Sequence, residues 1–367
     1  MMVPRLRLSG AALLAPLQRS LASIRSQSRT RLLWLGGAIA LIVIGVALAI
    51  FSPAPPTAQS VSTSINVQLP PSGGSGPSAS AGPSRGPIGE GGSATVLAPA
   101  PVPGMIEDTP NGPLPIIDKN GREPWQVYAR PFDSNDTRPR IALIVTGVGL
   151  DQSLSQAALD RLPGTITFGF DPYASNVKDS VANARNLGHE AMLGLPLEPL
   201  DYPRQDPGPL TLLTSLDPTQ NGDRLAKLMG KATGYVGFVA IMGSRFEAES
   251  TSLLPLLTAL KGRGLMFADD KAPEQSVVGP IAMQMKLPWA AGNIVIDSES
   301  DPTAIDQALA GLEASAKRNG VAIGIAALSP ALLDRVAPWL ATLDGKGIAI
   351  APASAIANHQ TAAKAAN

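Results

Sequence analysis

From Pro139 onward, the chain alternates between short apolar runs and stretches with a helical pattern. The apolar runs lie at 140–146, 165–170, 189–195, 235–242, 265–269, 293–297, 321–328 and 348–351. They are apolar throughout instead of alternating with polar residues, which is typical of parallel strands covered by helices on both faces. Repeating strand–helix units in this number predict an α/β fold in the form of a closed or nearly closed (β/α) barrel. A doubly wound open sheet is the alternative arrangement.

Residues that begin and end helices stand between these runs. An N-cap residue precedes a proline at the first helical position in Asp217-Pro218, Asp301-Pro302 and Ser329-Pro330. A glycine comes directly before four of the runs, where a helix is expected to end: Gly188, Gly264, Gly320 and Gly347. No GxGxxG or GxxxxGK[ST] motif follows a run, so nucleotide binding has no support.

The N-terminal region predicts a membrane anchor. Residues 32–51 form an uncharged apolar stretch that is long enough, at ~1.5 Å per residue, to cross the hydrocarbon core of a bilayer. Residues 1–31 carry six Arg and no acid, so the positive-inside rule leaves this tail in the cytoplasm and places the rest in the periplasm of a Gram-negative-type envelope. A mitochondrial transit peptide is the alternative for the Arg-rich start.

Composition divides the remainder of the chain. Residues 52–115 are rich in Pro, Gly, Ser and Ala and predict a disordered linker. Residues 116–138 contain large aromatic side chains again, which predicts a lead-in segment that packs on the domain. The domain is expected to span 139–356, with a flexible tail at 357–367.

Charge and rare residues exclude several function classes. After residue 138 the chain carries 18 basic and 22 acidic residues, a mildly acidic balance that argues against a nucleic-acid partner. The chain has no Cys, which excludes a thiolate nucleophile and a Cys-based metal site. The chain has two histidines. His189 is at the start of a predicted strand, opposite the expected site, and His359 lies beyond the last strand, so we expect neither to be a ligand.

Polar side chains follow the predicted strands, where a parallel barrel places its site. The candidates for a ligand groove are Glu198, Ser244, Arg245, Asp269 and Asp297. Acids with one Arg suit a ligand rich in hydroxyl groups. The alternative is that these acids are loop residues, helix caps or ion-pair partners, as the Asp301 cap illustrates.

Four segments carry a family resemblance: LPGTITFGFDPYASN (162–176), LGHEAMLGLPLEPLDYPRQDPGPLTLLTSL (187–216), GYVGFVAIMGSRF (234–246) and GLMFADDK (264–271). From Pro139 to about Pro352 the chain resembles the divergent polysaccharide deacetylase family. These proteins are relatives of carbohydrate esterases that remove N-acetyl groups from chitin and peptidoglycan. The resemblance implies a distorted (β/α) barrel and a zinc-dependent hydrolytic site.

The chain departs from the family where that chemistry is expected. Thr146 and Gly147 replace an Asp pair that serves as base and metal ligand, and Gly194 replaces a His. Ala240 and Ile241 replace Asn-His, and Ala326 and Ala327 replace Gly-His. The resemblance therefore implies that the ancestral zinc site is lost, with no cofactor in its place. If Ile241 and Met242 fill that space, the family's route is closed sterically as well.

We therefore expect a membrane-anchored envelope protein that is inactive in metal-dependent deacetylation and acts as a glycan-binding or scaffold module. Its expected partners are the membrane through 32–51, a polysaccharide or the peptidoglycan glycan, and an envelope protein. The first alternative is an active deacetylase or glycosidase that uses the remaining carboxylates Glu198, Asp269 and Asp297. A second is an adaptor that binds other proteins through its outer helices.

Overall fold

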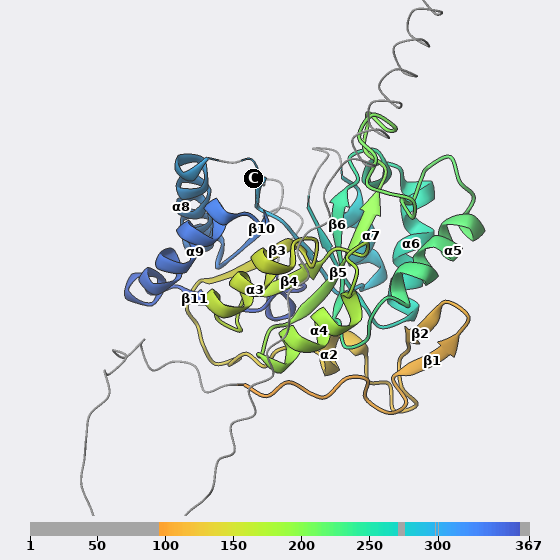
Figure 1. Cartoon of the computed structure of the whole chain (residues 1–367), viewed down its shortest axis with the longest axis horizontal. Coiled ribbons are helices and arrows are strands. Elements are labelled where there is room, and N and C mark those ends of the chain that lie inside the picture. The colour runs from red at the N-terminus through yellow and green to blue at the C-terminus, as the bar shows by residue number, and fades with distance from the viewer. Residues whose placement is uncertain (1–94, 271–275, 298, 300, 360–367) are drawn as a thin grey trace, which may run out of the picture. The chain divides into compact units, whose positions relative to one another are not determined.

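The computed structural model describes residues 95–270, 276–297, 299 and 301–359 (Figure 1). By compactness the chain divides into Met1–Arg85 and Gly86–Asn367, and the described residues belong to the second unit. The predicted basic tail and the predicted anchor at 32–51 lie outside the described residues. Within the described part of the chain, no helix has both the length and the hydropathy that crossing a bilayer requires.

A parallel, curled sheet forms the centre of the domain (Figure 1). Its strands run in the order β8-β7-β6-β5-β4-β3-β10-β9, and β11 pairs with β3. Every pair in this sheet is parallel. The strands are β3 (Arg140–Val148), β4 (Thr167–Phe170), β5 (Ala191–Leu197), β6 (Gly237–Met242), β7 (Met266–Asp269), β8 (Trp289–Ala291), β9 (Ile294–Ile296), β10 (Val321–Ala327) and β11 (Ala349–Ile350).

The two strands at the ends of this order are consecutive in the chain. Only Gly292 and Asn293 separate β8 from β9. The Gly292 amide donates to the Asp269 carbonyl at the end of β7, and the Asn293 amide donates to the Ile323 carbonyl in β10, both at 2.7 Å. One segment thus contacts both ends of the sheet. The strand order also advances in one direction from β3 to β8, without the reversal of a doubly wound sheet.

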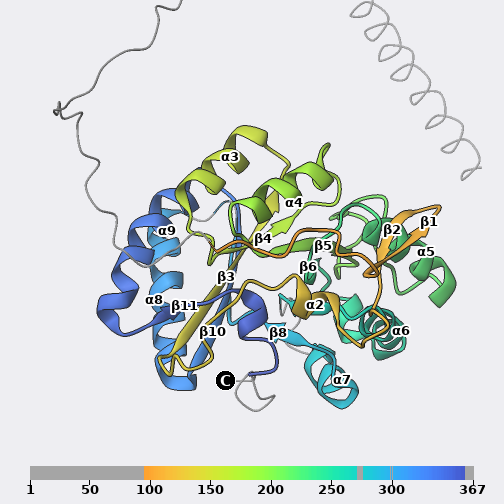
Figure 2. The ribbon, with the colours of Figure 1, turned by 90° about the horizontal axis from the view of Figure 1, so that it is seen from below.

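Seven helices of eight or more residues in the described part surround the strands (Figure 2). They are α3 (Gln152–Arg161), α4 (Val177–Asn186), α5 (Pro218–Met229), α6 (Ser250–Gly262), α7 (Val278–Met285), α8 (Pro302–Asn319) and α9 (Pro330–Leu343). Asp217, Asp301 and Ser329 cap α5, α8 and α9 through their side chains, as the sequence predicted.

The strands are apolar throughout because both of their faces are buried. Successive residues of β3 alternate between two hydrophobic clusters: Ile141 and Leu143 belong to one, and Ala142 and Ile144 to the other. The first cluster includes residues of the surrounding helices, and the second lies inside the curl of the sheet together with Met105 and Tyr128.

The folded region begins earlier than the sequence predicted. Residues 95–115 were expected in the disordered linker, but they contain the antiparallel hairpin β1 (Ile106–Thr109) and β2 (Gly112–Pro115). Met105 and Leu114 are buried in the domain, and these isolated apolar residues anchor an otherwise Pro- and Gly-rich stretch. The linker prediction is therefore wrong for residues 95–115.

This N-terminal segment crosses the end of the domain where the strands begin (Figure 2). Arg185 of α4 is 4% exposed and donates to the carbonyls of Tyr128 (2.9 Å) and Ala98 (2.7 Å). Tyr128, which follows the short helix α2 (Pro124–Val127), is itself buried. Because this end is covered, the carboxyl ends of the strands remain as the place for a site.

Candidate functional site

Five of the positions that the resemblance matches to the family's metal and base residues lie at the carboxyl edge of the sheet: Thr146, Gly147, Gly194, Ile241 and Ala327. Thr146 of β3 pairs with Ala327 of β10, and its hydroxyl donates to the Ala326 carbonyl at 3.4 Å. Gly147 follows Thr146 with φ of +77°. On the other side, Gly194 of β5 and Ile241 of β6 belong to paired strands. These side chains offer one hydroxyl and no imidazole or carboxylate.

Ile241 occupies the space in front of Gly194. A Cβ atom added to Gly194 would overlap the Cδ1 atom of Ile241 and lie 3.2 Å from Cδ of Pro172. A larger side chain at position 194 therefore requires Ile241 to move. Met242, the next residue, is 37% exposed and takes a positive φ of 62°, which is uncommon for a side chain of this size. Ile241, and not Met242, thus fills the space in front of Gly194.

Glu198, Ser244 and Arg245 come together beside the end of β5. The Glu198 carboxylate is buried and accepts from the amide and hydroxyl of Thr214 at 2.5 and 2.7 Å. Arg245 lies 3.6 Å from Glu198 and donates to the Leu200 carbonyl at 3.0 Å. The Ser244 hydroxyl accepts from the Leu200 amide at 2.9 Å. Of this group, Arg245 is the exposed side chain.

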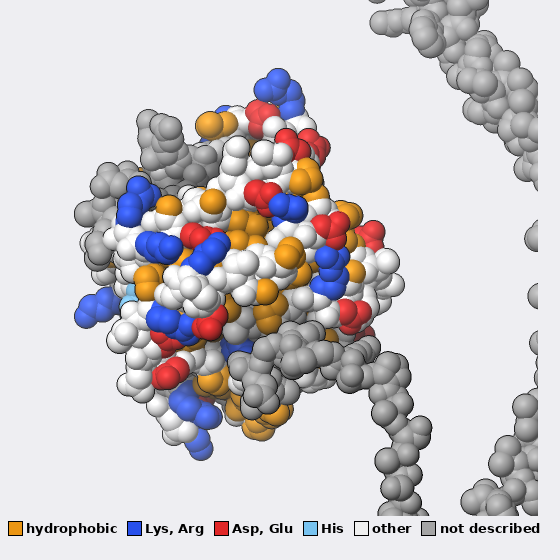
Figure 3. Space-filling view, turned by 90° about the vertical axis from the view of Figure 1, so that its left-hand side faces the viewer, with side chains coloured by type: hydrophobic (Ala, Val, Ile, Leu, Met, Phe, Trp, Pro, Cys, Tyr) orange, Lys and Arg blue, Asp and Glu red, His pale blue; other side chains and the backbone are white. Residues whose placement is uncertain are grey.

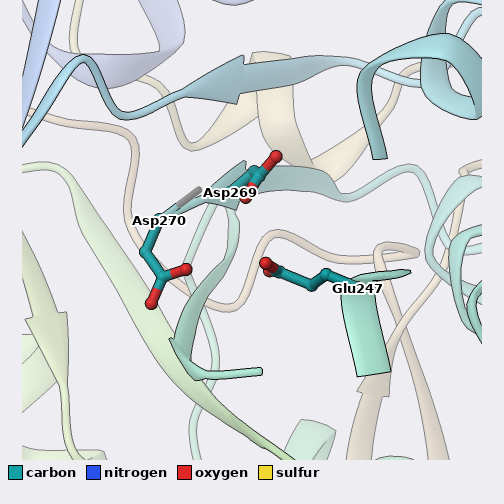
Figure 4. Close-up of side chains that lie close together, drawn as sticks. All are labelled: Glu247, Asp269 and Asp270. Carbon is teal, nitrogen blue, oxygen red and sulfur yellow. The ribbon is translucent and has the colours of Figure 1, made fainter. Parts of the chain in front are cut away.

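Asp269 belongs to a second group, which contains a residue that the sequence analysis missed. Glu247, Asp269 and Asp270 bring one carboxylate oxygen each to within 4.8 Å of one another (Figure 4). Asp269 ends β7 and Asp270 follows it, while Glu247 reaches toward them from the 3₁₀ turn Phe246–Ala248 after β6. The Ser276 hydroxyl donates to Asp269 at 3.1 Å.

Glu247 is the most unusual member of this acidic cluster. Its side chain is fully buried, and neither carboxylate oxygen has a hydrogen-bond partner within the part of the chain that the structure describes. Burial, followed by the negative charges of Asp269 and Asp270, raises the pKa of Glu247 well above its usual value. Nothing in the spacing of GSRFEAES marks this residue, because burial of an acid in a short turn depends on the loops packed around it.

The remaining predicted residues do not join either group. Asp297 is exposed and, among the described residues, forms no hydrogen bond or ion pair. His189 is buried before β5, where its ring stacks on Phe168 and its Nδ1 lies 3.1 Å from the Ile166 carbonyl. His359 is exposed in the C-terminal segment. The candidate groove residues thus divide into a Glu198 group, an Asp269 group and a separate Asp297.

The protein is thus an α/β domain whose curled parallel sheet is of the deacetylase type. Its polar candidate residues lie at the carboxyl edge of this sheet. Residues 143–357 match the model of the family described as "Divergent polysaccharide deacetylase". The chain belongs to this family.

The chain is also similar to two uncharacterised proteins. The first is a protein from Agrobacterium tumefaciens C58 whose crystal structure is known. Its sequence is 38% identical to this chain, and its structure matches with a TM-score of 0.65 over 67% of this chain and 99% of that one. An uncharacterised protein of Haemophilus influenzae is 23% identical over 186 residues, which are 51% of this chain. The match covers 65% of the Haemophilus protein's length.

Proposed function

We propose that this chain is an envelope protein whose domain binds a polysaccharide of acetylated amino sugars without deacetylating it by the family's zinc-dependent route. The observation that supports this proposal is the packing of Ile241 against Gly194. A hydrolytic zinc site requires imidazole or carboxylate ligands and an open coordination position. The five matched positions supply no such ligand, and the space in front of Gly194 is filled.

The rim beside this edge supplies groups that recognise sugars. Leu200 and Met242 are large apolar residues whose exposed fractions are 63% and 37%. The side chains of Ser244 and Arg245 form hydrogen bonds with the backbone of Leu200. Sugar rings present apolar faces and hydroxyl groups, which match apolar side chains beside a guanidinium with several donors. We call Leu200, Met242, Ser244 and Arg245 the rim patch and propose it as the glycan contact.

The location of the domain is part of this proposal. Residues 32–51 would anchor the chain in the inner membrane, with residues 1–31 in the cytoplasm and the domain in the periplasm. A linker with the composition of residues 52–94 would let the domain reach the peptidoglycan glycan. An envelope protein partner would bind the domain in the periplasm as well.

Binding of N-acetylated chito-oligosaccharides to the full-length chain in detergent, measured by isothermal titration calorimetry, tests the proposal. Arg245→Ala should weaken binding roughly tenfold, because the rim patch loses a charged donor. Arg335→Ala is the matched control, since Arg335 has a similarly exposed side chain and also pairs with an acid, Asp306, but lies on α9. Binding that Arg245→Ala leaves unchanged would refute the rim patch, and a protein partner retained by Arg245→Ala would favour an adaptor.

One observation favours the alternative of a hydrolase with altered chemistry. Asp269, a predicted catalytic candidate, lies in a buried group of carboxylates, and such groups are common in glycosidases. Cleavage of a polysaccharide by the wild-type protein that Asp269→Asn abolishes, while Asp297→Asn does not, would establish this alternative.

A further inference from the structure

We propose that Glu247, Asp269 and Asp270 form a binding site for a divalent cation with a preference for oxygen ligands, and that this cation is Ca²⁺. The three carboxylates come from two connections at the carboxyl edge of the sheet and place their oxygens within 4.8 Å of one another (Figure 4). The site does not include any position that the resemblance matches to the family's metal residues. Its residues also differ from those of the rim patch, although both use the turn after β6.

Clustered acids alone do not define a site, but Glu247 provides independent evidence. A fully buried carboxylate without a hydrogen bond costs several kcal/mol, so buried charges are normally paired or bound to metal. Among the described residues, no Lys, Arg or His forms an ion pair with Glu247, and its oxygens accept no hydrogen bond. Glu247 nevertheless points toward Asp269 and Asp270, two further acids, instead of toward solvent. A dication between the three groups removes this cost.

The backbone around Glu247 fixes the carboxylate in this position. The Glu247 amide donates to the Gly243 carbonyl at 2.9 Å, and the Glu247 carbonyl accepts from the Val277 amide at 3.0 Å. A Cβ atom at Gly243, where φ is +103°, would lie 3.3 Å from the carboxyl carbon of Glu247. The turn therefore packs closely against the carboxylate, which is held in place before any ion binds.

The donor set and its burial favour Ca²⁺. Three carboxylates with no nitrogen or sulfur donor suit a hard cation and not Zn²⁺. Mg²⁺ usually keeps several waters and binds through one or two carboxylates, whereas Ca²⁺ takes about six to eight oxygen ligands in a flexible geometry. Three converging carboxylates, one of them fully buried, therefore favour Ca²⁺. Asp270 is only half-buried, so water or a ligand hydroxyl can complete the coordination from its side.

The bound ion would join the turn after β6 to the end of β7. Asp269 already contacts the start of α7 through Ser276, whose hydroxyl also accepts from the Val278 amide at 3.3 Å. Calcium would therefore stabilise the two connections that follow β6 and β7 and should raise the thermal stability of the protein.

The test uses the full-length chain after treatment with a chelator, with no glycan present. Equilibrium dialysis should show one Ca²⁺ bound per chain, and added Ca²⁺ should raise the melting temperature more than the same concentration of Mg²⁺ or Zn²⁺. Glu247→Gln should weaken Ca²⁺ binding by on the order of tenfold or more, because it replaces a charged ligand by an amide. Glu249→Gln is the matched control: it is the same change two residues away, in an exposed side chain that caps α6.

Asp270→Asn, in a half-buried position, serves as the second variant if Glu247→Gln does not fold, and it too should weaken Ca²⁺ binding. The proposal is wrong if the wild-type protein binds no Ca²⁺, or if Glu247→Gln and Glu249→Gln bind it equally. A Glu247→Gln protein that is more stable than wild type and indifferent to Ca²⁺ would show that Glu247 instead shares a proton with its neighbours. Because calcium is measured without glycan, this outcome leaves the proposed glycan binding untouched.

Discussion

At the scale of single residues, the contact between Gly194 and Ile241 decides what the strand edge can hold. Gly194 has no side chain, and Ile241 extends into the space that one would use. The two residues lie on paired strands, so neither backbone can move away without disturbing the sheet. A change at one position therefore depends on the other.

Gly194→Ala should destabilise the protein by about 1–3 kcal/mol, because the new methyl group forces Ile241 out of its position. In a protein that already carries Ile241→Ala, the same Gly194→Ala change should cost much less free energy of unfolding, because the space in front of residue 194 is then open. Urea unfolding of the four proteins gives the coupling free energy. Strictly additive effects would show that Ile241 does not fill the space in front of Gly194.

His189 makes a separate contribution that depends on pH. Burial lowers the pKa of His189 from 6.5 to about 4. Between these values the unfolded chain binds a proton that the folded protein does not, so stability falls as the pH falls from about 6.5 toward 4. Across this pH range the free energy of unfolding should fall by about 3 kcal/mol in total. His189→Phe, which keeps a ring against Phe168, should reduce this slope in unfolding measurements at a series of pH values, and an unchanged slope would contradict the assignment.

At the scale of elements, Arg185 holds the N-terminal segment on the domain. Its two hydrogen bonds reach Ala98 and Tyr128, and its guanidinium also lies 5.1 Å from the centre of the Tyr128 ring. A charged donor bonded to buried carbonyls contributes about 1.5–3 kcal/mol per bond.

Arg185→Met should therefore increase the detached population of residues 95–105 at least tenfold, since about 1.4 kcal/mol corresponds to that factor. The expected result is faster proteolytic cleavage near Pro101 to Met105, with little change in cleavage elsewhere. Arg161→Met is the control, because Arg161 bonds to Leu333 and Asp334 of α9 and not to the N-terminal segment. Equal protection of the segment in both variants would contradict the role of Arg185.

The same elements show what the sequence could predict. Each predicted apolar run contains a strand, because burial on both faces leaves a continuous apolar signal. The hairpin β1–β2 was missed because only a few apolar residues, such as Met105 and Leu114, hold a stretch whose composition resembles a linker. Glu198 and Arg245 were correctly grouped as strand-end residues, but Glu247 was not found, because its neighbours are fixed by tertiary packing.

At the scale of the whole domain, the two ends of the strands differ. The beginning of the sheet is closed by the N-terminal segment and by Ser354, which with Thr167 and Arg130 forms hydrogen bonds to the buried Glu190. The opposite edge carries the rim patch and the acidic cluster. The face that includes α8 and α9 shows basic and acidic side chains next to each other, with scattered hydrophobic ones (Figure 3).

Several of these charges form ion pairs between helices, such as Arg335–Asp306 and Arg161–Asp334. Exposed pairs of this kind contribute little, about 0–1 kcal/mol each. The helical face is thus mixed in charge, whereas the strand edge concentrates acids in a buried group. The distribution supports a ligand at the strand edge more than one on the outer helices.

The most direct test of this account is an incubation of the full-length protein with an N-acetylated chito-oligosaccharide in the presence of Zn²⁺. The oligosaccharide is supplied at a concentration that saturates its binding to the protein, and it is then analysed by mass spectrometry. The account predicts that the oligosaccharide binds and is recovered with every acetyl group and every glycosidic bond intact. Recovery of a product that has lost acetyl groups would contradict it.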